Sequence, residues 1–379
     1  MRPIWKKGCK LNLNKVFQHK TVLITGHTGF KGSWLSMWLT HLGARVVGLS
    51  LDVPSEPSNF IVSSVRKKII EDHRVDVRDN KAVQSIIHKC QPDYVFHLAA
   101  QALVRNSYER PLETITTNAI GSANVLDALR VLKKSVVAVM ITSDKAYDNE
   151  EWVWGYRESD RLGGKDPYSA SKGMAELAIR AYVESYFSVP SSNVCVGIGR
   201  AGNVIGGGDW AVDRIVPDCM HAWSANKTVD IRSPGATRPW QHVLEPLSGY
   251  LALAATLNSN GGKHGEAYNF GPPANQNYSV SALIDEMGTH WDNVSWNNVF
   301  QSPQNLHEAD LLKLNCDKAL LDLNWMPTLK FKETVRMTVE WYKSFYENDV
   351  DTMHDFTIAQ IEEYTQLAKG RGIEWGSSS

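Results

Sequence analysis

The sequence predicts an α/β protein whose core is a doubly wound, parallel β-sheet. Short apolar segments alternate with helix-like segments through the first half of the chain, and a glycine-rich turn joins the first strand to the first helix. Alternation of this kind is typical of parallel sheets with helices on both faces. A chain of 379 residues is long enough to add a smaller, mixed α/β part after this sheet.

The first element, at residues 20–25, is an apolar run of the kind that forms a buried parallel strand. A turn with the spacing G-x-x-G-x-x-G follows it, then a helix-like segment that Gly43 ends, and then a second strand at residues 45–50. In this order the glycines let backbone N–H groups approach a pyrophosphate at a helix N-terminus, although the order also fits an unliganded turn. We predict a Rossmann-type dinucleotide site that contains Gly26, Thr28, Gly29, Phe30, Lys31 and Gly32.

Four further strands are expected in this half of the chain. The third lies in the region before Asp76, and the others are at residues 92–100, 136–142 and 193–199. A long helix-like stretch at residues 114–132 precedes the fifth. Because the carboxyl ends of parallel strands meet at one edge of the sheet, the segments that follow them should line a common ligand site.

The identity of the dinucleotide depends on the end of the second strand. An acidic residue there accepts hydrogen bonds from the ribose hydroxyls, whereas a basic residue holds the 2′-phosphate of NADP. Asp52 is the candidate acid, but strict alignment to the strand end places Ser50 there, and no arginine or lysine occurs from Val46 to Ser58. We therefore expect NAD, bound weakly because the carboxylate is displaced.

Two groups of reactive side chains flank a loop in the middle of the chain. Ser143, Asp144 and Lys145 come directly after the fifth strand. Tyr168 and Lys172 lie four residues apart where a helix is expected to begin, so they share a helix face and Lys172 can favour the phenolate of Tyr168. This matters because an ordinary tyrosine, with a pKa of about 10, is a poor base near neutral pH. The Y-x-x-x-K spacing also occurs by chance on surface helices.

The second half is expected to hold a smaller, mixed α/β part that binds the substrate. Residues 206–208 are three consecutive glycines, which either follow a ligand closely or form a flexible surface loop. Three arginines follow among aromatic residues, at Arg214, Arg232 and Arg238. Their guanidinium groups can each donate two hydrogen bonds to a diphosphate, although surface arginines often contact only solvent. We expect the dinucleotide-binding part to be residues 1–200 with a returning segment at about 238–260, the substrate part to be mainly residues 201–379, and the tail to fray from 370 to 379.

Composition excludes several classes of function. Forty basic and forty-one acidic residues give a net charge of −1, so no basic surface for nucleic acid is expected. The apolar runs are too short to span a membrane, and the N-terminal segment lacks the features of a secretory signal. Five cysteines, odd in number and never spaced as C-x-x-C, argue against a disulfide framework or zinc site and favour a reducing cytoplasm.

Six longer motifs indicate a family. They are TGHTGFKGSW, HLAAQALVR, TSDKAYDN, DPYSASKG, RAGNVIGGGDWAVDRIVPD and RPWQHVLEPLSGYL. Over about residues 16–364 the chain resembles the nucleotide-sugar 4,6-dehydratases of the extended short-chain dehydrogenase/reductase superfamily, and most of all the members that act on CDP-glucose. The resemblance implies NAD as cofactor and conversion of CDP-glucose to CDP-4-keto-6-deoxyglucose, in deoxysugar and O-antigen synthesis.

The resemblance also assigns roles to the reactive side chains. Tyr168, assisted by Lys172, would take the proton of the sugar's 4-hydroxyl, and Ser143 would bond the 4-oxygen. Asp144 would protonate the departing 6-hydroxyl. Lys145 is a departure, because the wider group carries glutamate there to remove the proton on carbon 5. Either its surroundings keep the amine neutral so that it acts as the base, or Lys145 only positions Asp144 or stabilises the enolate.

Binding contacts follow from the same resemblance. An aspartate in the position of Asp76 meets the adenine amino group in that family. The implied cofactor contacts besides the glycine turn are Asp52, Asp76, Val77, Leu98, Ala99, Ala100, Asn118, Tyr168 and Lys172. The implied substrate contacts are Gln101, Arg105, Asn203, Arg214 and Arg238, and no metal is implied.

Two other functions remain open. A nucleotide-sugar 4-epimerase or 4-keto reductase would need the cofactor, Tyr168 and Lys172, but not the acid–base pair Asp144 and Lys145. A non-catalytic dinucleotide-binding regulator is the more remote alternative, because such proteins usually lose the tyrosine or the lysine. The helices at residues 114–132 and 169–185 commonly form a two-fold interface in the superfamily, so we expect a homodimer or homotetramer.

Overall fold

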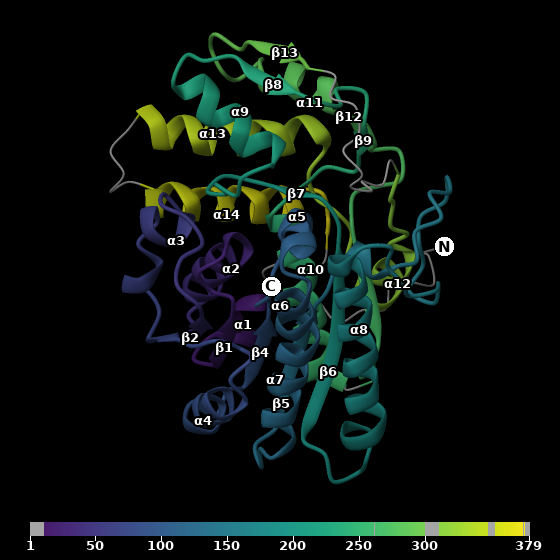
Figure 1. Cartoon of the computed structure of the whole chain (residues 1–379). Coiled ribbons are helices and arrows are strands. Elements are labelled where there is room, and N and C mark those ends of the chain that lie inside the picture. The colour runs from purple at the N-terminus through teal and green to yellow at the C-terminus, as the bar shows by residue number, and fades with distance from the viewer. Residues whose placement is uncertain (1–10, 261, 300–310, 348–352, 374, 376–379) are drawn as a thin grey trace, which may run out of the picture.

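A seven-stranded, fully parallel sheet forms the centre of the molecule (Figure 1). The computed structural model describes residues 11–260, 262–299, 311–347, 353–373 and 375. The sheet order is β11-β6-β5-β4-β1-β2-β3, so the chain winds in both directions from β1 and β4. The predicted doubly wound α/β fold is confirmed. The strands are β1 (Thr21–Thr25), β2 (Arg45–Ser50), β3 (Glu71–Arg74), β4 (Tyr94–His97), β5 (Val136–Ile141), β6 (Val194–Ala201) and β11 (Ala267–Phe270).

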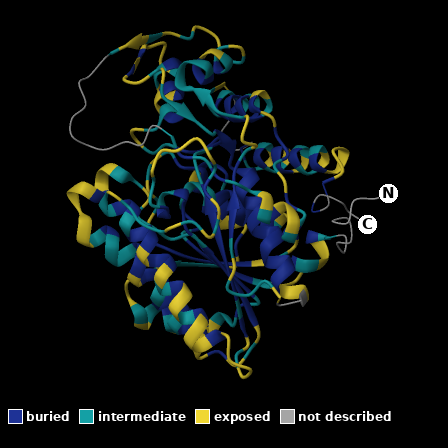
Figure 2. Cartoon of the chain, turned by 90° about the vertical axis from the view of Figure 1, so that its right-hand side faces the viewer, coloured by how far each residue is buried: buried dark blue, intermediate teal, exposed yellow. Residues whose placement is uncertain are grey.

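Helices cover both faces of this sheet, because alternate strand residues point to opposite sides and both sets are apolar. Figure 2 shows the result as a buried sheet between helices whose outer surfaces are exposed. One face is covered by α1 (Leu13–Phe17), α2 (Phe30–His41) and α10 (Leu244–Asn260). The other is covered by α4 (Asn80–Cys90), α7 (Gly121–Arg130) and α8 (Pro167–Tyr182).

Shorter helices lie in the connections of this part. They are α3 (Asn59–Val62), η1 (Val65–Lys67), α5 (Val104–Glu109), α6 (Pro111–Ile115), η2 (Thr116–Ile120), η3 (Asp144–Ala146) and η4 (Val183–Phe187). The helical stretch expected at residues 114–132 is present, but η2 is a π-helical turn inside it. Such turns often mark functional sites. Gly43, with φ +82°, ends α2 as expected.

The smaller lobe follows β6 and lies at the top of Figure 1. It contains a parallel strand pair, an antiparallel pair and helices of the second half. Its elements are α9 (Ile215–Ser224), β8 (Val229–Ile231), β9 (Thr237–Arg238), β12 (Tyr278–Ser279), α11 (Val280–Met287), β13 (Trp296–Asn298) and α13 (Phe331–Glu347). A short strand pair, β7 (Val204–Ile205) with β10 (Gln241–His242), lies between the lobe and the sheet. The helix α12 (Asp317–Leu323) packs beside β11.

The last helix, α14 (Met353–Gly370), packs against α2 in the first part of the fold. Beyond it, Ile373 and Trp375 are buried, and the Trp375 ring stacks on Tyr364 at a centroid distance of 5.2 Å. The expectation of a tail that frays from residue 370 is therefore wrong as far as Trp375, because apolar side chains fix it to the core. Residues 376–379 lie outside the described part.

The three consecutive glycines pack against the protein itself. A Cβ atom on Gly207 would lie 2.0 Å from Cγ of Trp341, so only glycine lets the backbone lie on that ring. The Trp34 indole donates to the Gly207 carbonyl at 2.9 Å. Residues 206–208 are buried, so this segment is not a flexible surface loop, and the close approach first attributed to a ligand is made to Trp341.

A buried ion pair fixes α8 against the end of β6. Arg200 and Glu176 are each 1% exposed, and Arg200 Nε donates to Glu176 Oε1 at 2.6 Å. The same carboxylate oxygen accepts from the Thr142 hydroxyl at 2.7 Å, at the end of β5. Arg200 also donates to the Tyr147 hydroxyl at 2.7 Å, which in turn donates to Asn269 of β11 at 2.8 Å. One network thus ties α8, β5, β6 and β11 together.

Removal of one partner of this pair should strongly destabilise the protein. Glu176→Ala leaves the Arg200 guanidinium buried without its carboxylate, which should lower the free energy of unfolding by about 3–5 kcal/mol. Urea denaturation measures the change. Glu340→Ala, which removes a half-exposed partner of Arg336, is the matched control and should cost less than about 1 kcal/mol. Equal, small losses in both variants would contradict the structural role of the pair.

A second buried carboxylate joins the C-terminal helices to α10. Glu245 is 1% exposed and accepts from the backbone N–H groups of Thr328 and Leu329 and from the Tyr364 hydroxyl, at 2.6–3.0 Å. Burial raises the pKa of Glu245 to about 7, although the N–H donors act in the opposite direction. The folded protein therefore keeps a proton on this group that the unfolded chain has lost.

This raised pKa predicts a pH-dependent stability. Between the ordinary glutamate pKa near 4.5 and the folded value near 7, the folded state binds more protons than the unfolded state, so its stability falls as pH rises. In Glu245→Gln this contribution is absent. The stability of the native protein relative to this variant should fall from pH 5 to about pH 8 and then level off. A constant difference across urea denaturation curves in that range would contradict the expectation.

Candidate active site

The glycine turn between β1 and α2 has the geometry of an anion-binding helix N-terminus. Gly26 has φ +76°, and a Cβ on Gly32 would lie 2.1 Å from the Gly26 carbonyl oxygen, so both positions require glycine. The N-cap of α2 is Gly29, where no side chain in the described residues caps the helix. The first N–H groups of α2 are therefore available to a negatively charged group such as a pyrophosphate.

The end of β4 lies directly beside this turn. A Cβ on Gly26 would lie 2.7 Å from the Ala99 nitrogen, which places the segment Leu98–Ala100 against the glycines. Asn118, in the π-helical turn, holds the next residue, because its side-chain oxygen accepts from the Gln101 N–H at 2.8 Å. Its amide also donates to Ser171 of α8 at 2.8 Å. Asn118 thus positions the loop and α8 relative to each other.

The two carboxylates expected to contact the cofactor, Asp52 and Asp76, already have partners within the protein. Both oxygens of Asp76 accept from Arg78 Nε, at 3.0 and 2.9 Å. The Asp52 side chain is 91% exposed and accepts from the Val53 N–H at 2.8 Å. Ser50 occupies the strand end, and its hydroxyl lies 2.8 Å from that of Thr28. Val77 is buried.

The predicted catalytic residues come together at the carboxyl end of β5 and the first turns of α8. Ser143 caps η3, donating to Asp144 Oδ1 at 2.9 Å and accepting from the Lys145 N–H at 3.2 Å. Tyr168 and Lys172 are 8% and 6% exposed on α8, and the ammonium lies 5.9 Å from the tyrosine ring centre. The helix begins here because Pro167 is its first residue and Asp166 caps it, accepting from the Ser169 N–H at 2.9 Å.

Burial shifts the acid–base properties of these groups. It raises the pKa of Tyr168 to about 12, although hydrogen bonding to Ser143 acts in the opposite direction. It also raises the pKa of Asp144, against the lowering effect of the neighbouring Lys145 charge. It lowers the pKa of Lys172 to about 8. For Tyr168, burial outweighs the effects of its neighbours, so its hydroxyl keeps its proton near neutral pH. That Lys172, which lies over the ring, favours the phenolate during the reaction stays a prediction.

Lys31 belongs to the same electrostatic group. Burial lowers its pKa to about 8, with the charges of Arg214 and Lys172 acting in the same direction and that of Asp144 in the other. Lys31 was expected only as a cofactor contact, yet its charge also interacts with those of Asp144 and Lys172, two of the predicted catalytic residues. Its position in the glycine turn, after Phe30, gave no sign of this.

The arginines expected at the substrate meet one loop of the smaller lobe. Arg214 pairs with Asp209 at 2.5 Å. Arg105, from α5, pairs with Asp213 at 3.0 Å, and the same carboxylate oxygen accepts from Arg232 at 3.0 Å. Three guanidinium groups from separate segments thus face residues 209–213.

The other expected substrate contacts lie differently. The Gln101 side chain holds its own loop, because its amide donates to the Thr114 hydroxyl at 2.9 Å and to the Leu103 carbonyl at 3.0 Å. Asn203 follows β6, and its carbonyl accepts from the Gln241 N–H at 3.2 Å. Arg238 lies on β9 and donates to the Thr237 carbonyl at 2.9 Å.

Among the residues that the structure describes, no three histidine, cysteine, aspartate or glutamate side chains lie close enough to share a metal ion. No helix among those residues is long and apolar enough to cross a bilayer.

Solved structures of other proteins share this fold. A UDP-glucose 4-epimerase from Stenotrophomonas maltophila with bound NAD matches with a TM-score of 0.74 at 19% identity, over 86% of this chain and 99% of that one. A dTDP-glucose 4,6-dehydratase from Bacillus anthracis in complex with NAD matches with a TM-score of 0.70 at 19% identity, over 86% and 97%.

The sequence gives a closer relationship. The chain is 46% identical over 338 residues to the CDP-glucose 4,6-dehydratase of Salmonella typhimurium, covering 88% of this chain and 93% of that protein. The family model described as GDP-mannose 4,6 dehydratase matches residues 23–338. The chain therefore belongs to the GDP-mannose 4,6-dehydratase family.

Proposed function

We propose that this protein is a CDP-glucose 4,6-dehydratase that uses NAD and converts CDP-glucose to CDP-4-keto-6-deoxyglucose. The observation that carries the proposal is the packing of η3, which holds Asp144 and Lys145 and is capped by Ser143, against α8, where Tyr168 hydrogen-bonds to Ser143 and Lys172 lies over the Tyr168 ring. The choice of CDP-glucose is supported by the 46% identity to the Salmonella enzyme.

The residues present fit NAD. Its pyrophosphate would bind the N-terminus of α2 at Gly29–Gly32, where the backbone N–H groups are available. Leu98–Ala100 and Asn118 would line the nicotinamide half, and Asp76 the adenine half. When bound, NAD supplies one chemical function, which is to accept a hydride from carbon 4 of the sugar and later return it to carbon 6.

Tyr168 would act as the base that removes the proton of the 4-hydroxyl, while the Ser143 hydroxyl bonds the same oxygen. With its pKa raised to about 12 by burial, Tyr168 needs added positive charge to lose its proton. Lys172, 5.9 Å from the ring centre, and the positively charged oxidised cofactor would provide that charge. The product of this step is a 4-ketone, which makes the proton on carbon 5 acidic.

Asp144 would supply the proton for the leaving 6-hydroxyl. Burial raises its pKa, so this carboxyl group is suited to hold a proton and to donate it. A base removes the proton from carbon 5, the bond from carbon 6 to oxygen breaks, and the hydroxyl leaves as water. The base then returns its proton to carbon 5, and the proton on Tyr168 passes through solvent to restore Asp144. The net change is the loss of one water molecule.

The wider proposal concerns the substrate and the setting. Arg105, Arg214 and Arg232, which face one loop of the smaller lobe, would hold the diphosphate. Residues 201–379 would thus contribute most of the sugar-nucleotide site. We place the enzyme in the cytoplasm, which is supported by the unpaired thiols of Cys90, Cys195, Cys219 and Cys316. The proposed product would serve deoxysugar and O-antigen synthesis.

A homodimer or homotetramer is part of the proposal. The α6–α7 and α8 helices lie side by side and expose apolar side chains that a second copy would cover. Among them, Leu112 is 73% exposed, Ile120 50% and Leu177 56%. A 4-epimerase or 4-keto reductase is the alternative function, but neither reaction needs a proton-bearing Asp144.

The proposed reaction predicts a defined product. Incubated with NAD and separately with CDP-, dTDP-, GDP- and UDP-glucose, the purified protein should give the alkali-detected 4-keto-6-deoxy product only from the CDP sugar, with no net NADH. Asp144→Asn keeps the shape of the side chain but cannot donate the proton, so turnover should fall by about 10²–10⁴-fold. An epimer from CDP-glucose, or full activity in the Asn variant, would contradict elimination.

The role of Lys145 can be tested separately. If its amine is the carbon 5 base, Lys145→Ala should lose the wash-in of solvent deuterium at carbon 5 in parallel with turnover. Lys165→Ala, an exposed lysine that donates to the Asn149 carbonyl, is the matched control and should leave both rates unchanged. Deuterium wash-in at the normal rate in Lys145→Ala would leave Lys145 only a positioning role.

A further inference from the structure

The ribose end of the dinucleotide groove lacks the acid that selects NAD. Ser50 ends β2, and its hydroxyl faces Thr28 rather than carrying a charge. Asp52, two residues later, is turned outward with its side chain 91% exposed. A carboxylate held at the strand end would bond the ribose hydroxyls and repel a 2′-phosphate. Ser50 carries no charge, so the end of β2 neither holds a carboxylate for the ribose hydroxyls nor repels a 2′-phosphate.

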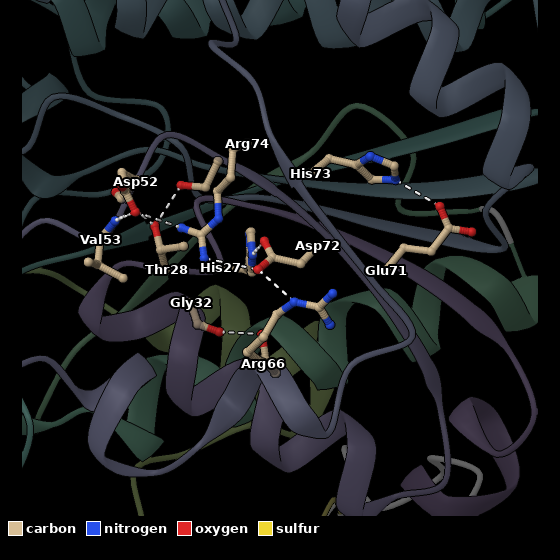
Figure 3. Close-up of polar contacts among 12 residues, drawn as sticks. His27, Thr28, Gly32, Asp52, Val53, Arg66, Glu71, Asp72, His73 and Arg74 are labelled. Carbon is tan, nitrogen blue, oxygen red and sulfur yellow. Dashed lines mark hydrogen bonds and ion pairs between the residues drawn. The ribbon is translucent and has the colours of Figure 1, made fainter.

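An arginine reaches the same place from the neighbouring strand. Arg74 is the last residue of β3 and lies opposite Ser50 in the parallel register. Figure 3 shows its guanidinium between Asp72 on one side and Thr28 and Asp52 on the other. One terminal nitrogen donates to the Leu51 carbonyl at 3.2 Å. Arg74 comes more than twenty residues after Ser50 in the chain, so its position beside the end of β2 depends on strand pairing and not on local sequence.

Packing holds this guanidinium in place. Arg74 lies over the Phe60 ring at 5.0 Å and donates to Asp72 Oδ2 at 2.9 Å. Asp72 is 5% exposed and also accepts from His27 at 2.8 Å and pairs with Arg66 at 3.1 Å. Its single negative charge is therefore shared between two arginines.

The remaining contacts of Arg74 are weak enough to be exchanged. The nitrogen that faces the end of β2 is 3.5 Å from the exposed Asp52 carboxylate. An exposed pair of this kind contributes little, about 0–1 kcal/mol. A phosphate, which carries more charge and offers several acceptor oxygens, can replace it.

We propose that Arg74 is a cofactor-selectivity residue that lets this protein bind NADP as well as NAD, by pairing with the 2′-phosphate of the adenosine ribose. The inference rests on the proposed function, since it concerns the same dinucleotide site. It changes the expectation of NAD alone, which relied on residues near Asp52 in sequence and not on those near it in space.

Direct binding to the protein freed of cofactor tests this without turnover. Titration calorimetry with NAD and with NADP should give dissociation constants within about tenfold of each other. In Arg74→Gln, NADP should bind about 10–100-fold more weakly, as expected for loss of a charge-assisted contact, while NAD changes less than threefold. 2′-AMP, which carries the same 2′-phosphate, should compete with NADP for the native protein, and its affinity should be weaker in Arg74→Gln, as that of NADP is.

Two further variants separate the explanations. Arg66→Gln removes the other arginine on Asp72, which does not contact the end of β2, and should leave the ratio of the two constants unchanged. Ser50→Asp keeps Arg74 but adds the missing acid, and should weaken NADP selectively. NAD binding with NADP more than a thousandfold weaker in the native protein would overturn the inference, as would equal losses of both cofactors in Arg74→Gln. If neither dinucleotide bound, the proposed function would fail as well.

Discussion

The buried pair of Arg200 and Glu176 is the interaction on which the rest of the site depends. Two charges with 1% exposure are costly to bury unless they meet, so β6 and α8 have one relative position in which the fold is stable. Thr142 joins the same carboxylate from the end of β5. Tyr168 and Lys172 lie on α8, and Ser143 directly follows Thr142. The geometry between Ser143 and the pair of Tyr168 and Lys172 is therefore set by an ion pair that has no role in the proposed reaction.

Desolvation then prepares the reactive side chains. The same dry surroundings raise the pKa of Asp144 and lower the pKa of Lys172, because each charged form is disfavoured. These opposite shifts bring the pKa values of both groups closer to neutral pH, where proton transfer is efficient.

Local pattern predicted most of the central sheet and the location of the reactive groups. The strand at Arg45–Ser50, the glycine turn and the helix that begins near Tyr168 depend on neighbouring residues, and such signals can be read from the sequence. Partners distant in the chain could not be predicted. Gly207 looked like a ligand loop because its partner, Trp341, lies far away in sequence. Arg74 was missed for the same reason, since strand pairing and not chain order brings it to Ser50.

The packing of α14 on α2 has a consequence for synthesis of the chain. In α2 every residue from Gly32 to Leu39 is buried, so this helix has no solvated face of its own. Trp38 is covered from outside by Tyr364 and Trp375, which the ribosome adds to the chain long after Trp38. The part of the chain up to β6 is made before α14 but cannot cover α2 alone. It must wait, with aromatic surface exposed, until the C-terminal helix arrives, and this is the stage at which we expect a nascent chain to need a chaperone most.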